Sequence, residues 1–266
     1  MVKDKNTLIV SMTSWPKRIK YCSRVFFSIM ESDCPKDKYH LVLVLCEKEF
    51  PNKEADLPEV LRLMIEAGDV ELIWHPTNIF SHKKLMPVLK KYPDNPILVC
   101  DDDIIRPKHW LPAFLKDHAE HPDEIIVGGC VFDISFDGNV LNPVKRFRFD
   151  PPSCAGKIVK GARPANGFGG VLYPAHTFTD PRFFDEKLFM ELSAYSDESW
   201  QYCFSIMYNK TMRWLSVYIP HQHGQQDGTY DCSMSKLRKP KDSYVNIYNK
   251  LLNYFPEFKA NMKNYV

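Results

Sequence analysis

The sequence ILVCDDDIIRP at residues 97–107 decides the fold, because four apolar residues lead directly into three aspartates. A short apolar run with β-branched residues is typical of a buried strand. Three carboxylates at the end of such a strand repel one another and cannot all be freely solvated. A divalent cation would resolve this conflict, since a hard ion takes oxygen ligands and cancels the local charge. The alternative is an acidic turn in which Asp103 caps the segment that follows.

Upstream of this stretch, the predicted strands and helices alternate. Apolar runs predict the strands and helical spacing of apolar residues predicts the helices, in the order 7–12, 18–30, 40–46, 57–67, 70–74, 82–91 and 97–100. This alternation predicts right-handed crossovers and therefore an α/β fold with a mostly parallel central sheet flanked by helices. In such sheets ligands bind at the carboxyl ends of the strands, which is where the three aspartates fall.

The second half of the sequence is less regular. We expect strands at 124–132 and 170–173, and helices at 185–190 and 199–208. No internal repeat and no low-complexity linker divides the sequence, so we expect one continuous domain followed by a C-terminal tail.

The composition argues against several classes of protein. The 266 residues carry a formal net charge of only +2, which gives no global field for binding nucleic acid. The eight cysteines include no CxxC pair, so neither a zinc finger nor a redox dithiol is supported. No run approaches the roughly 18 apolar residues that a spanning helix needs, and the N-terminus is too short and polar for a signal peptide. We therefore expect a cytoplasmic protein with reduced cysteines.

The aspartates themselves suggest how a cation would be held. In an extended segment Asp101 and Asp103 would point to one side, roughly 7 Å apart, and Asp102 to the other. Asp101 and Asp103 could then serve one ion, with one of them in direct contact and the other holding a water or a ribose hydroxyl. The oxygen ligands favour Mn²⁺ or Mg²⁺.

Four motifs follow one another along the sequence: SMTSWPKRI (11–19), HKKLMPVLKKYPDNPILVCDDDIIRP (82–107), GFGGVLYP (167–174) and SDESW (196–200). As an ordered set they resemble glycosyltransferases of the GT-A (Rossmann-like) fold, closest to bacterial enzymes of the family 2 type. The resemblance implies metal-dependent transfer of a sugar from a nucleotide-sugar donor, with a UDP-sugar favoured, to a hydroxyl of a glycan or a lipid-linked saccharide. It also implies a GT-A domain at 1–235, with a nucleotide-binding half at 1–105 and an acceptor-binding half at 106–235, and a basic, aromatic helical tail at 236–266.

The resemblance further implies which residues contact the donor. The loop after the first strand, with Thr13, Ser14 and Arg18, would lie against the base and ribose. Glu47, after the second strand, would face the base. One of Lys83 and Lys84 would reach the pyrophosphate or the base, and the other would be an ordinary surface lysine. Glycines would let the backbone approach the donor sugar closely. The implied donor-binding residues are Thr13, Ser14, Arg18, Glu47, Lys83, Lys84, Asp101, Asp102, Gly169 and Gly170. The alternatives are a helix salt bridge for the arginine, an exposed loop glutamate and a tight glycine turn.

For the cation, the implied ligands are Asp101, Asp103, His221 and His223, the histidines lying in PHQHG. The ion would bridge the two phosphates and stabilise the departing nucleoside diphosphate. Two surface histidines in a polar loop are the alternative reading.

The implied catalytic residues are Asp197 and Glu198, one of which would deprotonate the acceptor hydroxyl. Their order departs from the commonest Glu-Asp order of the family, so the choice between them stays open. Both also suit the first turn of a helix, where acidic residues are favoured by the helix dipole. A base of this kind implies an inverting reaction, and a retaining one stays open.

Two further features have alternative readings. Trp110 and Trp200 would either stack on sugar rings or lie in the core. The tail has apolar and aromatic residues at helical spacing over 242–258, after a basic cluster at 236–241. It would either dock onto the domain or lie on the inner face of the membrane, close to a lipid-linked acceptor.

Two rival functions remain at this stage. A sugar-phosphate nucleotidyltransferase usually needs a glycine-rich phosphate loop, but residues 11–19 contain no glycine and the sequence has no P-loop or GxGxxG motif. A non-catalytic nucleotide- or carbohydrate-binding module would have no use for a base, so the acidic pair at Asp197 and Glu198 argues against it.

Overall fold

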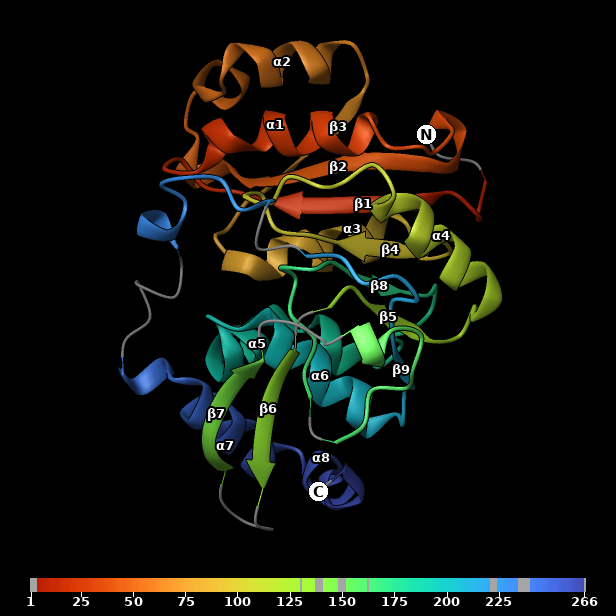
Figure 1. Ribbon diagram of the computed structural model, residues 1–266. Helices are drawn as coiled ribbons and strands as arrows, with labels where there is room; N and C mark the ends of the chain where they lie inside the picture. Colours follow the sequence, from red (N-terminus) through yellow and green to blue (C-terminus); the bar gives the residue numbers. More distant parts are fainter. Residues whose placement is uncertain are drawn as a thin grey trace.

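A computed structural model describes residues 4–129, 131–136, 141–147, 152–161, 163–220, 224–233 and 240–265. It shows a mixed α/β fold in which helices flank a seven-stranded sheet of order β3-β2-β1-β4-β8-β5-β9 (Figure 1). The predicted fold class, a mostly parallel sheet between helices, is confirmed.

The first four strands form the parallel part of this sheet. They are β1 (Leu8–Thr13), β2 (Tyr39–Cys46), β3 (Val70–His75) and β4 (Ile97–Val99). β1 pairs in parallel with both β2 and β4, and β2 pairs in parallel with β3. These strands end at the same edge, so the segments that follow β1 and β4 are neighbours there.

The second half adds antiparallel pairing. β8 (Val171–Tyr173) runs antiparallel to β4 and to β5 (Ile125–Val127), and β9 (Met212–Trp214) runs parallel to β5. The single strand predicted at 124–132 is instead two elements, because β6 (Val131–Phe136) leaves the main sheet and pairs with β7 (Leu141–Phe147).

The helices cover both faces of the sheet (Figure 1). α1, α2 and α4 pack on one face, and α3, α5 and α6 contribute to the core of the other. Their bounds are α1 Ile19–Met30, α2 Glu59–Glu66, α3 Met86–Lys91, α4 Trp110–Glu120, α5 Glu186–Ser193, α6 Asp197–Met207, α7 Tyr244–Tyr254 and α8 Pro256–Met262. The helix expected at 82–91 is α-helical only from Met86, because residues 82–84 belong to a 3₁₀-helix, η4 (Phe80–Lys84).

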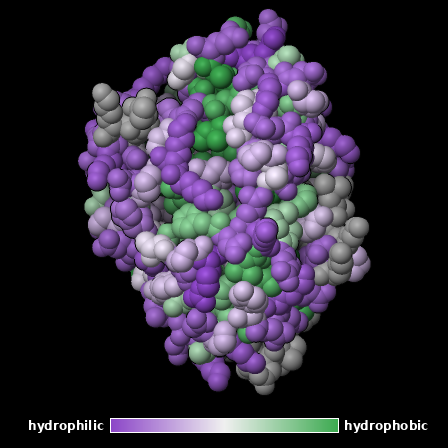
Figure 2. Space-filling model, turned by 180° about the vertical axis from the view of Figure 1, so that it is seen from behind, coloured by the Kyte–Doolittle hydropathy of each residue, from purple (hydrophilic) through white to green (hydrophobic). Residues whose placement is uncertain are grey.

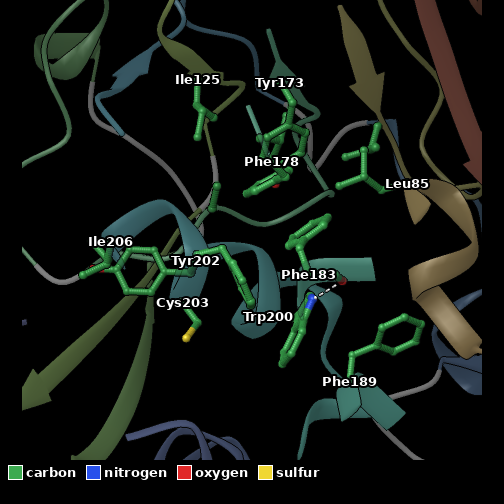
Figure 3. Close-up of a cluster of buried hydrophobic side chains, with 14 of the residues drawn as sticks. Leu85, Ile125, Tyr173, Phe178, Phe183, Phe189, Trp200, Tyr202, Cys203 and Ile206 are labelled. Carbon is green, nitrogen blue, oxygen red and sulfur yellow. Dashed lines mark hydrogen bonds between the residues drawn. The ribbon is translucent and has the colours of Figure 1, made fainter. Parts of the chain in front are cut away.

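Successive strand residues alternate between the two core clusters, as strand geometry requires. Ile9 belongs to the cluster on one face and Val10 to the cluster on the other. The first cluster is rich in aromatic side chains, and Figure 3 shows Trp200 of α6 beside Phe183, whose carbonyl oxygen accepts the indole N–H at 3.0 Å.

The C-terminal tail is docked onto the domain. Leu251 and Phe255 are fully buried, and α7 and α8 pack against α6. The apolar face that could have lain on a membrane is therefore used inside the protein. The basic residues at 236–239 lie outside the described residues.

No helix in the described part of the chain is both long and apolar enough to cross a lipid bilayer. Figure 2 shows the back of the molecule, where hydrophilic residues predominate and hydrophobic ones reach the surface in patches.

Candidate functional site

The three aspartates follow β4 at the carboxyl edge of the sheet. Residues 102 and 103 form a turn, so the expectation of an extended segment is wrong. The predicted alternation of side chains therefore does not hold: the Arg18 Nη2 atom contacts both Asp102 and Asp103, the latter at 2.8 Å. Asp101 has a different set of partners.

The loop after β1 reaches this turn because β1 and β4 are adjacent in the sheet. The Ser14 hydroxyl donates a hydrogen bond to Asp102 Oδ2 at 2.5 Å. Asp102 and Asp103 are only 5% and 6% exposed, so their charges depend on these protein partners. Two of the predicted donor-loop residues, Ser14 and Arg18, thus lie directly at the aspartates.

Lys84 joins the aspartates to the predicted acidic pair. Its Nζ atom lies 3.0 Å from Asp101 Oδ1 and 3.4 Å from Asp197 Oδ2. Two motifs far apart in the sequence are therefore brought together around one buried ammonium group.

The neighbouring Lys83 is also buried, so the expectation that one of the two lysines lies on the surface is wrong. Lys83 Nζ lies 3.0 Å from Glu49 Oε2 and 3.1 Å from Asn78 Oδ1. Asn78 Nδ2 also donates to Glu49 Oε1 at 2.8 Å. This cluster holds the loop after β3 against the 3₁₀-helix after β2, η2 (Glu47–Glu49).

The acidic pair opens helix α6. The Ser196 hydroxyl accepts a hydrogen bond from the Ser199 backbone N–H, so it is the N-cap. Asp197 is only 2% exposed and also accepts from Gln201 Nε2 at 3.3 Å. Glu198 is only partly buried, and its Oε1 accepts from Asn166 Nδ2 at 2.9 Å. The two carboxylates therefore have different surroundings: Asp197 faces inward to Lys84, and Glu198 is the more accessible one.

The glycine-rich segment before β8 lies between these groups. A Cβ atom on Gly167 would lie 2.8 Å from Lys84 Nζ and 2.9 Å from Asp101 Oδ1. Gly170 has a φ of +92°, a conformation that L side chains rarely adopt, and a Cβ on Gly169 would lie 2.2 Å from the Gly128 carbonyl oxygen. Close approach to protein groups thus explains these glycines, and their contact with a donor sugar stays a prediction.

Two other predicted donor-binding residues, Thr13 and Glu47, make contacts within the protein near the strand ends. The Thr13 hydroxyl donates to the Val44 carbonyl oxygen at 2.7 Å, which ties β1 to β2. Glu47 is paired with Lys53 Nζ at 2.6 Å, and its side chain is 42% exposed. Their roles toward the donor stay predictions.

His221 and His223 lie outside the described residues, so their role as ligands stays a prediction. The segment that follows them is described, and it runs beside the aspartates. The Gly224 carbonyl oxygen accepts from the Ile105 N–H at 2.8 Å, and the Gln226 N–H donates to the Asp103 carbonyl oxygen at 2.9 Å.

Burial and ion pairing together set the pKa values in this cluster. Burial raises the pKa of Asp102 to about 6, although Arg18 opposes the shift, and it also raises the pKa of Asp103. Burial acts in the same direction on Asp101, but Lys84 outweighs it and leaves the pKa of Asp101 below its ordinary value. Burial alone would lower the pKa of Lys84, but the carboxylates around it, Asp101 foremost, raise it well above its ordinary value.

The charges of the described residues leave room for a cation. Five carboxylates interact with three cationic side chains, which leaves two negative charges unbalanced when all of them are ionised. The carboxylates are those of Asp101, Asp102, Asp103, Asp197 and Glu198, and the cationic side chains are those of Arg18, Lys84 and Arg106. Within the described ranges no three acidic, histidine or cysteine side chains converge on one point as a complete metal site. In charge and in oxygen-donor chemistry the cluster would suit a divalent ion, which would need further ligands besides these carboxylates.

Both tryptophans belong to the core. Trp110 and Trp200 are 0% exposed, so the reading in which they stack on a sugar is wrong. Their N–H groups donate to backbone carbonyl oxygens, that of Trp110 to Gly169 at 2.9 Å. Trp110 thereby supports the glycine segment from behind.

Sequence reasoning missed two residues of the site. Asn166 holds Glu198 and also accepts from the Phe168 N–H at 2.9 Å, which fixes its amide. Arg106 is buried, lies over the Trp110 ring at 4.7 Å, and donates to the Phe168 carbonyl oxygen at 2.8 Å. The signal in the sequence was their position: Asn166 lies directly before GFGG, and Arg106 lies inside the motif at 82–107, three residues after the last aspartate.

Comparison with known proteins gives the fold. No protein-family model matches the chain, and no curated protein matches it. The crystal structure of S. aureus TarS 1-349 matches with a TM-score of 0.52 and 16% identity, covering 79% of this chain and 58% of that one, and the same fragment in complex with UDP gives the same values. A longer S. aureus TarS structure matches with a TM-score of 0.51 and 15% identity over 79% of this chain and 35% of that one. The chain thus spans less than two thirds of the TarS chains, and at this identity the likeness shows the fold alone.

Proposed function

We propose that the protein is a metal-dependent glycosyltransferase that moves a sugar from a nucleotide-sugar donor, a UDP-sugar by preference, to a hydroxyl of a saccharide or lipid-linked acceptor. The observation that carries this proposal is the convergence of Asp101 and Asp197 on Lys84. A binding site for a diphosphate and a base for the acceptor must be neighbours in such an enzyme, because the sugar passes between them.

The fold supports the same conclusion. The TarS fragment that shares this fold has been solved in complex with UDP. A uridine nucleotide is therefore the first donor class to test.

On the donor side, Asp101 and Asp103 would hold Mn²⁺ or Mg²⁺, with the predicted His221 and His223 as candidates for further ligands. The ion would supply Lewis-acid neutralisation of the departing diphosphate. Arg18 holds Asp102 and Asp103 together at the end of β4 and so fixes the orientation of this acidic turn.

On the acceptor side, Glu198 is the better base of the pair. It is partly accessible, whereas Asp197 is 2% exposed and paired with Lys84. A sugar hydroxyl is a very weak acid, so a carboxylate within hydrogen-bond reach must take its proton as the new bond forms. Asn166 holds one oxygen of Glu198 and leaves the carboxylate in a defined orientation. A single displacement with this base would invert the anomeric centre.

A thermal-shift panel tests the donor site. We expect UDP to raise the melting temperature in the presence of Mn²⁺ and much less without it, because a ligand that binds only the folded state stabilises it. GDP, dTDP and CMP serve as comparisons that identify the base. If no nucleotide shifts the melting temperature with either ion, the proposed donor site is wrong.

The variant Glu198→Gln tests the base. We expect it to keep the UDP-dependent thermal shift and to lose about 10²–10⁴-fold in UDP release from UDP-sugars. The control is Asp180→Asn, a buried carboxylate paired with Arg182 rather than with the site, which should retain turnover. Release of pyrophosphate from UTP and a sugar 1-phosphate, with no release of UDP from UDP-sugars, would identify a nucleotidyltransferase. Binding without turnover in the unaltered protein would identify a binding module.

A further inference from the structure

Lys84 lies between two carboxylates that come from different halves of the chain. Its side chain is 5% exposed, with Asp101 Oδ1 at 3.0 Å and Asp197 Oδ2 at 3.4 Å from the ammonium nitrogen. A buried charge of this kind is stable only while it is paired. The ammonium is therefore shared between the end of β4 and the first turn of α6.

The two partners are not equivalent. The Asp101 side chain is 31% exposed, whereas that of Asp197 is 2% exposed and is also bound by Gln201. Gly167 closes the other side, since a Cβ there would lie 2.8 Å from Lys84 Nζ. Asp101 is thus the partner that an incoming ion can reach, and Asp197 is the one that stays inside.

We propose that Lys84 is a positioning residue that couples cation binding at Asp101 to the first turn of α6, which contains Glu198. The inference rests on the proposed function, in which a divalent ion and a diphosphate bind at Asp101. Such an ion competes with the ammonium for the Asp101 carboxylate. Lys84 then has Asp197 as its remaining close partner, and the contact with α6 tightens as the donor binds. The donor would in this way order the acceptor side before the acceptor arrives.

Linkage gives this coupling a definite sign. When the Asp197 charge is removed, Asp101 is the one carboxylate left within ion-pair distance of Lys84, and Glu198 acts on the ammonium only from farther away. Lys84 then competes harder with the ion for Asp101, so the ion binds more weakly. When Lys84 is removed as well, Asp101 is released and the affinity for the ion recovers. Couplings between sites are typically 5–150-fold, and we expect about tenfold for the loss of a buried partner.

The experiment measures Mn²⁺ binding to the full chain in the presence of UDP, from the electron paramagnetic resonance signal of free Mn²⁺, without any turnover. Asp197→Asn should bind Mn²⁺ about tenfold more weakly than the unaltered protein, and K84M/D197N should bind at least as tightly as the unaltered protein. Glu198→Gln is the matched control, because it removes the same charge one residue away and leaves the contact between Lys84 and Asp197 in place. Asp180→Asn controls for the loss of a buried carboxylate elsewhere and should bind as the unaltered protein does.

Hydrogen exchange gives a second readout. Mn²⁺ with UDP should slow amide exchange in the first turn of α6 in the unaltered protein and leave it unchanged in K84M/D197N. Equal weakening of Mn²⁺ binding in D197N and E198Q would overturn the coupling, because a general loss of negative charge would then explain both. In that case the proposed donor site would still stand, whereas absence of Mn²⁺ and UDP binding in the unaltered protein would overturn both proposals.

Discussion

Glu71 on β3 should make the stability of the fold depend on pH in the acidic range. Its carboxylate lies 2.6 Å from His40 Nε2 on β2 and accepts short hydrogen bonds from Lys91 and Tyr92 at the end of α3. Burial alone would raise the pKa of Glu71, but these three donors outweigh it and lower the pKa from 4.5 to about 2. The Glu71 carboxyl group therefore ionises more readily in the folded protein than in the unfolded chain.

The magnitude follows from that shift. Each pKa unit corresponds to about 1.4 kcal/mol, so the ionised carboxylate stabilises the fold by at most about 3 kcal/mol. The side chain is 22% exposed, so solvent screening reduces this value only in part. Because the folded pKa is lowered, the stabilisation is complete above about pH 4.5 and is lost as the pH falls toward 2.

The variant Glu71→Gln, which cannot ionise, should be less stable by about 2–3 kcal/mol at pH 7, as measured by urea unfolding. The difference from the unaltered protein should shrink between pH 4.5 and pH 3. Glu66→Gln, at an exposed position on α2, is the control and should change stability by less than about 0.5 kcal/mol. A difference that stays constant from pH 7 to pH 3 would refute the reasoning, since it would then come from packing rather than from charge.

Two further predictions concern the site and the tail. Gly167→Ala should weaken Mn²⁺ and UDP binding several-fold and cost about 1–3 kcal/mol in urea unfolding, because the added methyl group would lie within 3 Å of both Lys84 Nζ and Asp101 Oδ1. Gly68→Ala, where a Cβ would meet nothing within 4 Å but φ is +78°, should lose about 1 kcal/mol of stability and leave binding unchanged. Leu251→Ala should cost about 2–5 kcal/mol in a single urea transition, because this residue of α7 is fully buried in the shared core; a separate early transition would show that the tail folds as an independent unit.

Most of the parallel part of the sheet could be predicted because β1, β2 and β4 are buried on both faces. The apolar run that forms β2 (Tyr39–Cys46) is almost entirely buried. Such a continuous apolar run is easily told apart from the helices between the strands, in which apolar and polar residues are mixed. The second half gave weaker signals. One apolar run at 124–132 is divided between β5 of the main sheet and β6 of the two-stranded sheet β6-β7. The spacing of apolar residues in the sequence gives no sign of this change from one sheet to another.

The sequence indicated the residues of the candidate site but not the contacts between them. The acidic residues after β4 and at the start of α6 were recognisable as residue types in context, whereas their pairing depends on the tertiary fold. Sequence spacing placed Asp101 and Asp103 on one side, but the turn at 102–103 gave Asp102 and Asp103 a shared partner, Arg18. Trp200 could not be distinguished from a sugar-stacking residue by its type, because only packing shows that it is enclosed by other aromatic rings.

One antiparallel strand explains why the glycine segment belongs to the site at all. The segment precedes β8, and Val171 at the start of β8 pairs with Val99 at the end of β4. Had β8 been parallel to β4, the residues before it would lie at the opposite edge of the sheet, away from the aspartates. Because it is antiparallel, Gly167 lies against Asp101 and Lys84, and Asn166 beside it reaches Glu198. The reversal of strand direction at β8 thus connects the acidic end of the parallel strands with the helix that presents the proposed base.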